Sequence, residues 1–185
     1  HHGGRGRGER DCQFTSGKPA IGTIFFGVKQ NSRMNLDAID KKLLRLLQDD
    51  GRLSNADLAQ RIGLSASACL RRLQRLEEQG VIAGYSATLS GEAIGKPTTV
   101  FIEVTLDSQV GTALDAFERA VAACEDILEC HLMSGDFDYL LRVAVADMRD
   151  YERVHRQRVA AFPHVARIRT AFAMRAVVAR RGYVL

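Results

Sequence analysis

The chain has 185 residues, of which 46% are hydrophobic and 26% charged, a composition typical of one or two globular domains. No apolar run approaches the ~20 residues that span a bilayer, so we expect a cytoplasmic protein with no membrane partner. The formal net charge of +4 comes entirely from residues 1–33, which hold six Lys/Arg and two Asp/Glu, so any nucleic-acid surface must be a local basic patch.

Residues 1–33 are rich in glycine and arginine, begin with two histidines and show no sustained apolar period. This composition cannot bury a core and predicts a disordered tail. The tail is typical of a tag remnant, or of sequence translated upstream of a natural start at Met34. A basic arm that reaches for DNA is the functional alternative.

A helical apolar period begins directly after Met34 and predicts the first helix. Its apolar face consists of Leu36, Ile39, Leu43, Leu46 and Leu47. Asp37 can accept hydrogen bonds from the free backbone N–H groups at the start of this helix, and Gly51 suits its end.

Two further helices follow, and each begins with a serine that can cap it, Ser54 and Ser65. The residues expected to face the core are Leu58, Ala59 and Ile62 in the second helix, and Cys69, Leu70, Leu73 and Leu76 in the third. A short turn with Gly63 joins the two helices, which is the layout of a helix-turn-helix.

The segments Val81–Tyr85 and Ser86–Leu89 are short and β-like, and they predict a small wing after the third helix. We therefore expect an N-terminal (winged) helix-turn-helix domain over residues 34–90. Residues 91–98 have no apolar period and are predicted to be a linker.

The outer face of the third helix has the chemistry of a surface that reads DNA. Between residues 65 and 75 it carries three arginines and no acid, and small residues would let the helix N-terminus approach base edges. The helix dipole favours phosphate there, and the arginines can reach phosphates or guanine edges. The predicted DNA-binding residues, which include the start of the second helix, are Ser54, Asn55, Ser65, Ser67, Ala68, Arg71, Arg72 and Arg75. An ordinary solvated helix face is the alternative.

The second half of the chain alternates strands with a period of two and helical segments. The predicted order is a strand over 98–106, a helix over 111–124, strands over 127–134 and 139–146, a helix from Asp147 to about Pro163, and a strand over Val165–Val178. With right-handed crossovers this βαββαβ order gives a ferredoxin-like sandwich, so the fold class is α+β with a sandwich domain over residues 99–180. The sheet face without helices would still carry Phe101 and Met133, so we expect a second copy to cover it.

The stretch SGDFDYLL lies at the turn between the two middle strands and has two interpretations. Asp136 or Asp138 can accept hydrogen bonds from an ammonium group, and backbone N–H groups near Gly135 can bind a carboxylate, so the loop suits an amino acid. The alternative is that the aspartates only make the turn. The chain has no GxSxG, HExxH or phosphate-loop spacing, and the loop offers too few ligands for a metal. We therefore predict no catalytic residues, no metal and no cofactor.

The four cysteines, Cys12, Cys69, Cys124 and Cys130, form no CxxC pair. Cys69 and Cys124 lie at apolar positions of helical patterns, which favours reduced, packed thiols. Disulfides or metal binding are the alternative.

Residues 34–185 resemble the Lrp/AsnC family of bacterial and archaeal transcription regulators, also called feast/famine regulators. The resemblance rests on LDAIDKKLLRLLQDDGRLSNADLAQRIGLSASACLRRLQRLEEQGVI in the first half and on ECHLMSGDFDYLLRV in the second. It implies an N-terminal helix-turn-helix domain and a C-terminal effector-sensing domain of the sandwich type. It also implies double-stranded DNA as a partner, dimers that assemble into octamers or other rings, and small amino acids bound between dimers. The family often has proline where this chain has Ala66 and Ala68.

The chain looks closest to the leucine-responsive branch, which makes leucine or another branched-chain amino acid the implied effector. In the family, the positions of Leu132, Asp138 and Met148 are tied to effector response, as is the strand around Ala171–Ala173. The predicted effector-binding residues are Leu132, Gly135, Asp136, Asp138, Met148, Ala171, Phe172 and Ala173.

The predicted function is a sequence-specific, nucleoid-associated transcription regulator whose DNA binding and assembly respond to a small amino acid. Two other functions remain open: an architectural DNA-binding protein without an effector, and an enzyme built on the sandwich domain. DNA binding that is insensitive to amino acids would indicate the first, and turnover of a small molecule would indicate the second.

Overall fold

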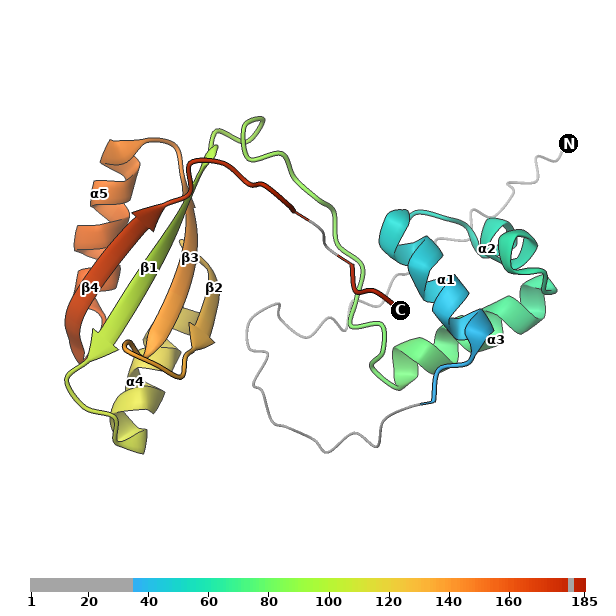
Figure 1. Ribbon diagram of the computed structural model, residues 1–185, viewed down its shortest axis with the longest axis horizontal. Helices are drawn as coiled ribbons and strands as arrows, with labels where there is room; N and C mark the ends of the chain where they lie inside the picture. The colour runs from blue at the N-terminus through green and yellow to red at the C-terminus, as the bar shows by residue number, and fades with distance from the viewer. Residues whose placement is uncertain (1–34, 180–181) are drawn as a thin grey trace, which may run out of the picture.

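The computed structural model describes residues 35–179 and 182–185, so the predictions for residues 1–33 lie outside the described residues. The elements form a helical group and an α/β sandwich, which are joined by the segment between α3 and β1 (Figure 1). The helical group consists of α1 (Ala38–Asp49), α2 (Asn55–Ile62) and α3 (Ala66–Glu78).

The three predicted helix caps are confirmed. Asp37 accepts from the backbone N–H of Asp40, whose own carboxylate accepts from the backbone N–H of Asp37, so α1 begins with a capping box. The serine caps of α2 and α3, Ser54 and Ser65, each accept from a backbone N–H three residues further on. Gly63 ends α2 at a φ of 75°, a left-handed conformation that glycine adopts without strain, and this makes the tight turn into α3.

The core of the helical group contains the predicted apolar residues with one exception. Its buried members are Leu43, Leu44, Leu58, Ala59, Ile62, Cys69 and Leu76, and the other predicted residues that pack against them are partly buried: Leu36, Ile39, Leu46, Leu47 and Leu73. Leu70 was expected to face inward but is 43% exposed. It lies about 100° around the helix from Cys69, which places it beside the outer face that carries Arg71.

The two short β-like segments predicted after α3 are not strands in the structure, because residues 81–90 form no strand. Tyr85 and Leu89 are exposed, so these residues have no apolar face that would hold a hairpin together. The chain continues through a turn at residues 91–95 into the first strand of the sandwich.

The sandwich confirms the predicted βαββαβ order and the ferredoxin-like fold. Its elements are β1 (Thr98–Leu106), α4 (Gly111–Ala122), β2 (Ile127–Leu132), β3 (Tyr139–Val145), α5 (Met148–Gln157), a 3₁₀ turn (Val159–Ala161) and β4 (Val165–Phe172). The antiparallel strand order is β2-β3-β1-β4. Both helices cover one face of the sheet (Figure 1), and alternate residues of β1 and β3 pack with Phe117, Val121 and Val154 in the core.

Two element ends differ from the prediction by about five residues or more, and the ends of α4, β2 and β3 differ by one or two. The last strand ends at Phe172 rather than at Val178, because β1 begins at Thr98 and offers no partner beyond the bond from Ala173 N to Thr99 O. The helix after Asp147 ends at Gln157 rather than near Pro163, and a 3₁₀ turn follows it.

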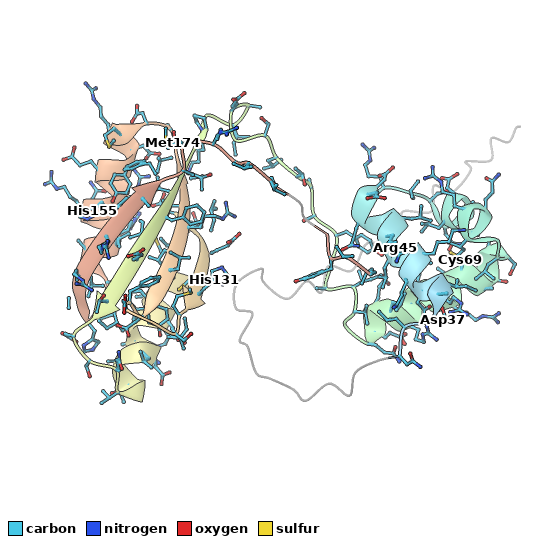
Figure 2. The ribbon with its side chains drawn as sticks, in the orientation of Figure 1. Asp37, Arg45, Cys69, His131, His155 and Met174 are labelled. Atoms are coloured by element: carbon cyan, nitrogen blue, oxygen red, sulfur yellow. The ribbon has the colours of Figure 1, made fainter. Side chains whose placement is uncertain are left out.

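The end of the chain returns to the helical group (Figure 1). The side-chain amide of Gln48 on α1 donates to Tyr183 O (3.1 Å) and accepts from Tyr183 N (2.5 Å). Arg45, labelled in Figure 2, donates to Leu185 O, and the Leu185 side chain packs against the helical core. We refer to residues 182–185 as the return segment.

Candidate DNA-binding and effector sites

The start of α3 is an open helix N-terminus lined by hydroxyl groups. Ser65 Oγ accepts from the backbone N–H of Ala68 at 3.2 Å and lies 3.2 Å from Ser67 Oγ. Ser65 and Ser67 are exposed, whereas Ala68 is half-buried. Backbone N–H groups and the positive end of the helix dipole therefore face solvent, an arrangement that favours a phosphate or another anion.

The predicted residues at the start of α2 hold the turn together. Ser54 caps α2 and donates from its hydroxyl to Asp57 at 2.5 Å. Asn55 Nδ2 donates to the carbonyl of Ala66 at 2.9 Å, so it connects the start of α2 to the start of α3. Its Oδ1 is buried with no partner among the described residues. Asn55 thus positions α3 from within the domain.

The three arginines of α3 divide into two groups. Arg72 Nη1 lies 2.6 Å from Asp37 and 2.8 Å from Asp40, and Arg75 Nη2 lies 2.6 Å from Asp40. Asp40 is 1% exposed, so two cations from α3 compensate one buried carboxylate of α1. Asp37 lies at this junction (Figure 2), and hydrogen bonds from the Asp40 backbone and from Arg72 lower its pKa.

Arg71 is the arginine of α3 that is free to reach outward. It is exposed and makes no hydrogen bond or ion pair with any residue in the described part of the chain. Gln74 is also exposed and lies three residues further along the same face, where Ser67, Arg71 and Gln74 follow helical spacing. Gln74 was not predicted, although the spacing from Ser67 could have indicated it.

Asp138 in the GDFD loop is 8% exposed and already has hydrogen-bond partners in this chain. Its Oδ2 accepts from the backbone N–H of Leu106 and its Oδ1 accepts from Gln109 Nε2, both at 2.7 Å. The backbone N–H of Asp138 donates to Val104 O at 3.0 Å. Asp138 therefore fastens the loop to the end of β1. Gln109 was not predicted from the sequence, because its bond to Asp138 spans 29 residues.

Asp136 in the same loop is exposed and has no ion pair or hydrogen bond among the described residues. The turn before it needs Gly135, whose φ of 152° other residues rarely adopt. Below the loop, Tyr139 donates to Glu118 at 2.8 Å, and burial raises the pKa of this tyrosine.

Met148 and the predicted residues around Phe172 lie at the opposite end of the sheet from the GDFD loop. Met148, 64% exposed, lines a shallow depression of about 280 Å³ with Tyr151, Glu152 and His155, the last of which is labelled in Figure 2. The ring of Phe172 packs edge-on against Tyr151, with centroids 5.0 Å apart. Ala171 and Ala173 flank Phe172 on the chain.

A single chain does not bring all the predicted effector residues together. Leu132 is 62% exposed on the edge strand β2, where it pairs with Tyr139 of β3. Phe172 lies on the other edge strand, β4, where it pairs with Val100 of β1. These edges are separated by β3 and β1 in the strand order. A site that uses both groups would need residues from more than one copy of the chain.

Within the described residues, no group of three or more His, Cys, Asp or Glu side chains could hold a metal ion. Cys69, Cys124 and Cys130 are free thiols, and Cys12 lies outside the described residues. No described helix combines the length and the apolar character needed to cross a bilayer.

Two family profiles divide the chain as its fold does. The profile "Winged helix-turn-helix DNA-binding" matches residues 36–83, and "Lrp/AsnC ligand binding domain" matches residues 99–183. The leucine-responsive regulatory protein of Haemophilus influenzae is 46% identical over 142 residues, which are 77% of this chain and 86% of that protein. The chain belongs to the Lrp/AsnC family. Its helices α1–α3 and its GDFD loop lie within the DNA-binding and ligand-binding domains respectively.

Other Lrp/AsnC proteins support this assignment over most of the chain. The Bkd operon transcriptional regulator of Pseudomonas aeruginosa is 44% identical over 145 residues, covering 78% of this chain and 95% of that protein. A transcriptional regulator from Neisseria meningitidis, solved in complex with L-Met, superposes with a TM-score of 0.77 at 31% identity, covering 81% and 97% of the two chains. An AsnC family regulator from Agrobacterium tumefaciens gives a TM-score of 0.76 at 36% identity, covering 80% and 96%. The protein is thus a transcription regulator that combines a DNA-binding domain with an amino-acid-binding domain.

Proposed function

We propose that this Lrp/AsnC regulator reads DNA with the exposed start of α3 and that an apolar amino acid modulates this binding. The observation that carries the proposal is the pairing of an open, hydroxyl-lined helix N-terminus and the unpaired Arg71 with a separate domain of the ligand-binding type. Ser65, Ser67 and Ala68 would approach the DNA backbone and base edges, and Arg71 would read a guanine or a phosphate.

In this proposal the remaining predicted DNA-binding residues have different roles. Arg72 and Arg75 orient α3 through Asp40, and Asn55 orients it through Ala66. Ser54, exposed at the start of α2, lies where the first helix of such a motif crosses the phosphate backbone.

We further propose that the protein acts as a homodimer and as larger rings of dimers. The sheet face opposite α4 and α5 carries Phe101, which is only half-buried in the single chain. A second copy would cover this face and place two α3 helices on one side of the DNA, about 34 Å apart or a multiple of it. With chromosomal DNA as the partner, we expect the protein in the cytoplasm with the nucleoid.

The effector we propose is leucine or another branched-chain amino acid. The exposed side chains of Leu132, Met148 and Phe172 are apolar and suit a branched aliphatic side chain. Asp136 and Asp138 would face the ammonium group, and the backbone at Gly135 would face the carboxylate, with residues from neighbouring copies completing the site. We propose no enzymatic role and no cofactor for this site.

A thermal-shift screen against the twenty amino acids, followed by DNA binding with and without each hit, tests the proposal. We expect a branched-chain amino acid to raise the melting temperature and to change DNA affinity by about 5- to 150-fold. DNA binding that no amino acid changes would instead indicate an architectural protein.

A further inference from the structure

We propose that Gln109 is a built-in competitor for the effector: its side-chain amide occupies the Asp138 carboxylate in the free protein and must leave when an amino acid's ammonium group binds there. This inference rests on the proposed function, because it needs an amino acid at the GDFD loop. Gln109, which lies outside the loop, would then set how tightly and how selectively the effector binds.

Gln109 lies between the Asp138 carboxylate and solvent. Asp138 is almost fully buried, and the backbone N–H of Leu106 binds one of its oxygens from within the sheet. The other oxygen accepts from Gln109 Nε2 at 2.7 Å. Gln109 is exposed, so its amide covers the carboxylate from the solvent side. A ligand that approaches from solvent therefore meets Gln109 before it reaches Asp138.

The Gln109 amide and the ammonium group of an amino acid differ in charge as hydrogen-bond donors to Asp138. Gln109 offers a neutral amide N–H, whereas an amino acid offers an ammonium group with a full positive charge. A hydrogen bond between two charged groups is stronger than one between a charged and a neutral group. An ammonium can therefore displace the amide, but a ligand with a hydroxyl in place of the ammonium has no such advantage. Gln109 would thus make the site selective for amino acids over the corresponding hydroxy acids.

The residues on either side of Gln109 differ in how firmly they are held, so release of its side chain would affect the start of α4. Asp107, before it, is held by the backbone bond from its N–H to His164 O at 2.8 Å. Val110, after it, begins α4 without a side-chain cap and is exposed. The bond to Asp138 is therefore the main polar contact of the Gln109 side chain, and its loss would loosen the start of α4 while Asp107 stays in place.

Isothermal titration with the best amino acid of the thermal screen tests this inference. In Gln109→Ala the ammonium no longer competes with an amide, so affinity should rise by roughly three- to tenfold, the worth of one hydrogen bond. The matched control Gln60→Ala removes an exposed glutamine of α2 and should leave the affinity unchanged. Equal or weaker binding by Gln109→Ala would overturn the inference and leave the proposed function intact. If no amino acid bound the unmodified protein, the proposed function would fall, and the inference with it.

A second measurement needs no substitution. The side-chain ¹⁵N–¹H₂ resonances of Gln109 in the unmodified protein should move toward those of a solvent-exposed glutamine as the amino acid is added. The matching hydroxy acid, at the same concentration, should leave them in place. Resonances that stay unchanged at saturation with the amino acid would show that Gln109 keeps its bond to Asp138, and the competitor role would be wrong.

Discussion

Asp40 divides the arginines of α3 into two that bind its carboxylate and one that stays exposed. Its buried carboxylate receives hydrogen bonds from Arg72 and Arg75, so these side chains point back toward α1. A buried charge without partners is costly, which means that both arginines contribute to folding. Arg71, next to them in sequence, makes no such contact with the described residues and remains available for DNA.

Arg72→Ala should therefore destabilise the helical domain. Removing one partner of a buried ion pair costs about 3–5 kcal/mol, and the loss here should fall below that range because Arg75 still donates to Asp40. Urea unfolding measures the difference. The double variant Asp40→Asn/Arg72→Ala should recover part of the loss, since no buried charge is then left short of a partner. Unchanged stability in Arg72→Ala would contradict this account.

Arg71→Ala should do the opposite: it should leave the melting temperature unchanged and weaken operator binding. A direct contact with a guanine is worth about 1–3 kcal/mol and confers preference at one base pair. If Arg71 instead contacts a phosphate, the slope of log affinity against log salt concentration should become shallower by about one unit. Fluorescence anisotropy at several salt concentrations distinguishes the two. Full affinity in the variant would remove Arg71 from the DNA interface.

At the scale of elements, Arg153 joins α5 to the segment before β2. It lies 3.1 Å from Asp126 and 2.8 Å from Asp150, and its hydrogen bond is the main reason why the pKa of Asp126 lies below 3.8. A hydrogen bond from the Ala146 backbone, followed by Arg153, lowers the pKa of Asp150 as well. In both cases the folded protein favours the ionised carboxylate.

This arrangement predicts a loss of stability in acid. A carboxylate whose pKa is lowered by folding stabilises the folded state above its unfolded pKa, and that contribution disappears as the pH falls through 3.8 toward the folded value. Denaturant unfolding at pH 7, 5 and 3 should show the decline between the last two. Asp126→Asn should be less stable at pH 7 and show a flatter decline. An equally steep decline in this variant would assign the acid sensitivity to other carboxylates.

The elements that could be predicted from the sequence are those whose signals are local. Asp37, Ser54 and Ser65 cap their helices through backbone groups three residues away. Along β1, apolar residues alternate in sequence because every second side chain faces the core. Where the ends depend on a partner strand, the prediction was wrong: residues 81–90 pair with no strand in the described part of the chain, and β4 ends where β1 begins.

The candidate sites were less predictable because their contacts join distant residues. A helical wheel places Arg71, Arg72 and Arg75 on one outer face, but only the packing of α1 on α3 brings Asp40 within reach of two of them. Likewise, the pattern GDFD indicates an acidic turn, yet the bond between Asp138 and Gln109 spans 29 residues and has no local signal. For the same reason, Leu70 follows the apolar period but lies outside the core.

At the scale of the whole molecule, the uncovered sheet face predicts how copies associate. Phe101 lies on this face between the partners Arg142 and Ala171. Phe101→Asp should weaken dimers by about 2 kcal/mol or more, the cost of losing a central aromatic contact. Analytical ultracentrifugation should then show smaller species at the same concentration. Leu89→Asp, which changes an exposed side chain outside the sheet, is the control and should sediment as the unmodified protein does.

The return segment also predicts how tolerant the protein is of operator geometry. Gln48→Ala removes both hydrogen bonds to Tyr183. A set of operators whose half-sites differ in spacing by single base pairs measures the effect. The unmodified protein should prefer spacings near one helical turn, about 10–10.5 base pairs, or a multiple. Gln48→Ala should bind the set more evenly, whereas Gln60→Ala should not. An unchanged spacing profile in Gln48→Ala would contradict this prediction.

The reason is that the return segment, which follows the sandwich in the chain, binds α1 of the helical group. A domain attached by a single linker can rotate about that linker. Here residues 79–97 connect α3 to β1, and the return segment also binds Gln48 and Arg45 of α1. We expect the second attachment to limit how far the helical group can turn relative to the sandwich, and with it the orientation of α3. In the proposed dimer, we expect the distance between the two α3 helices to be maintained in part by the hydrogen bonds between the return segment and α1.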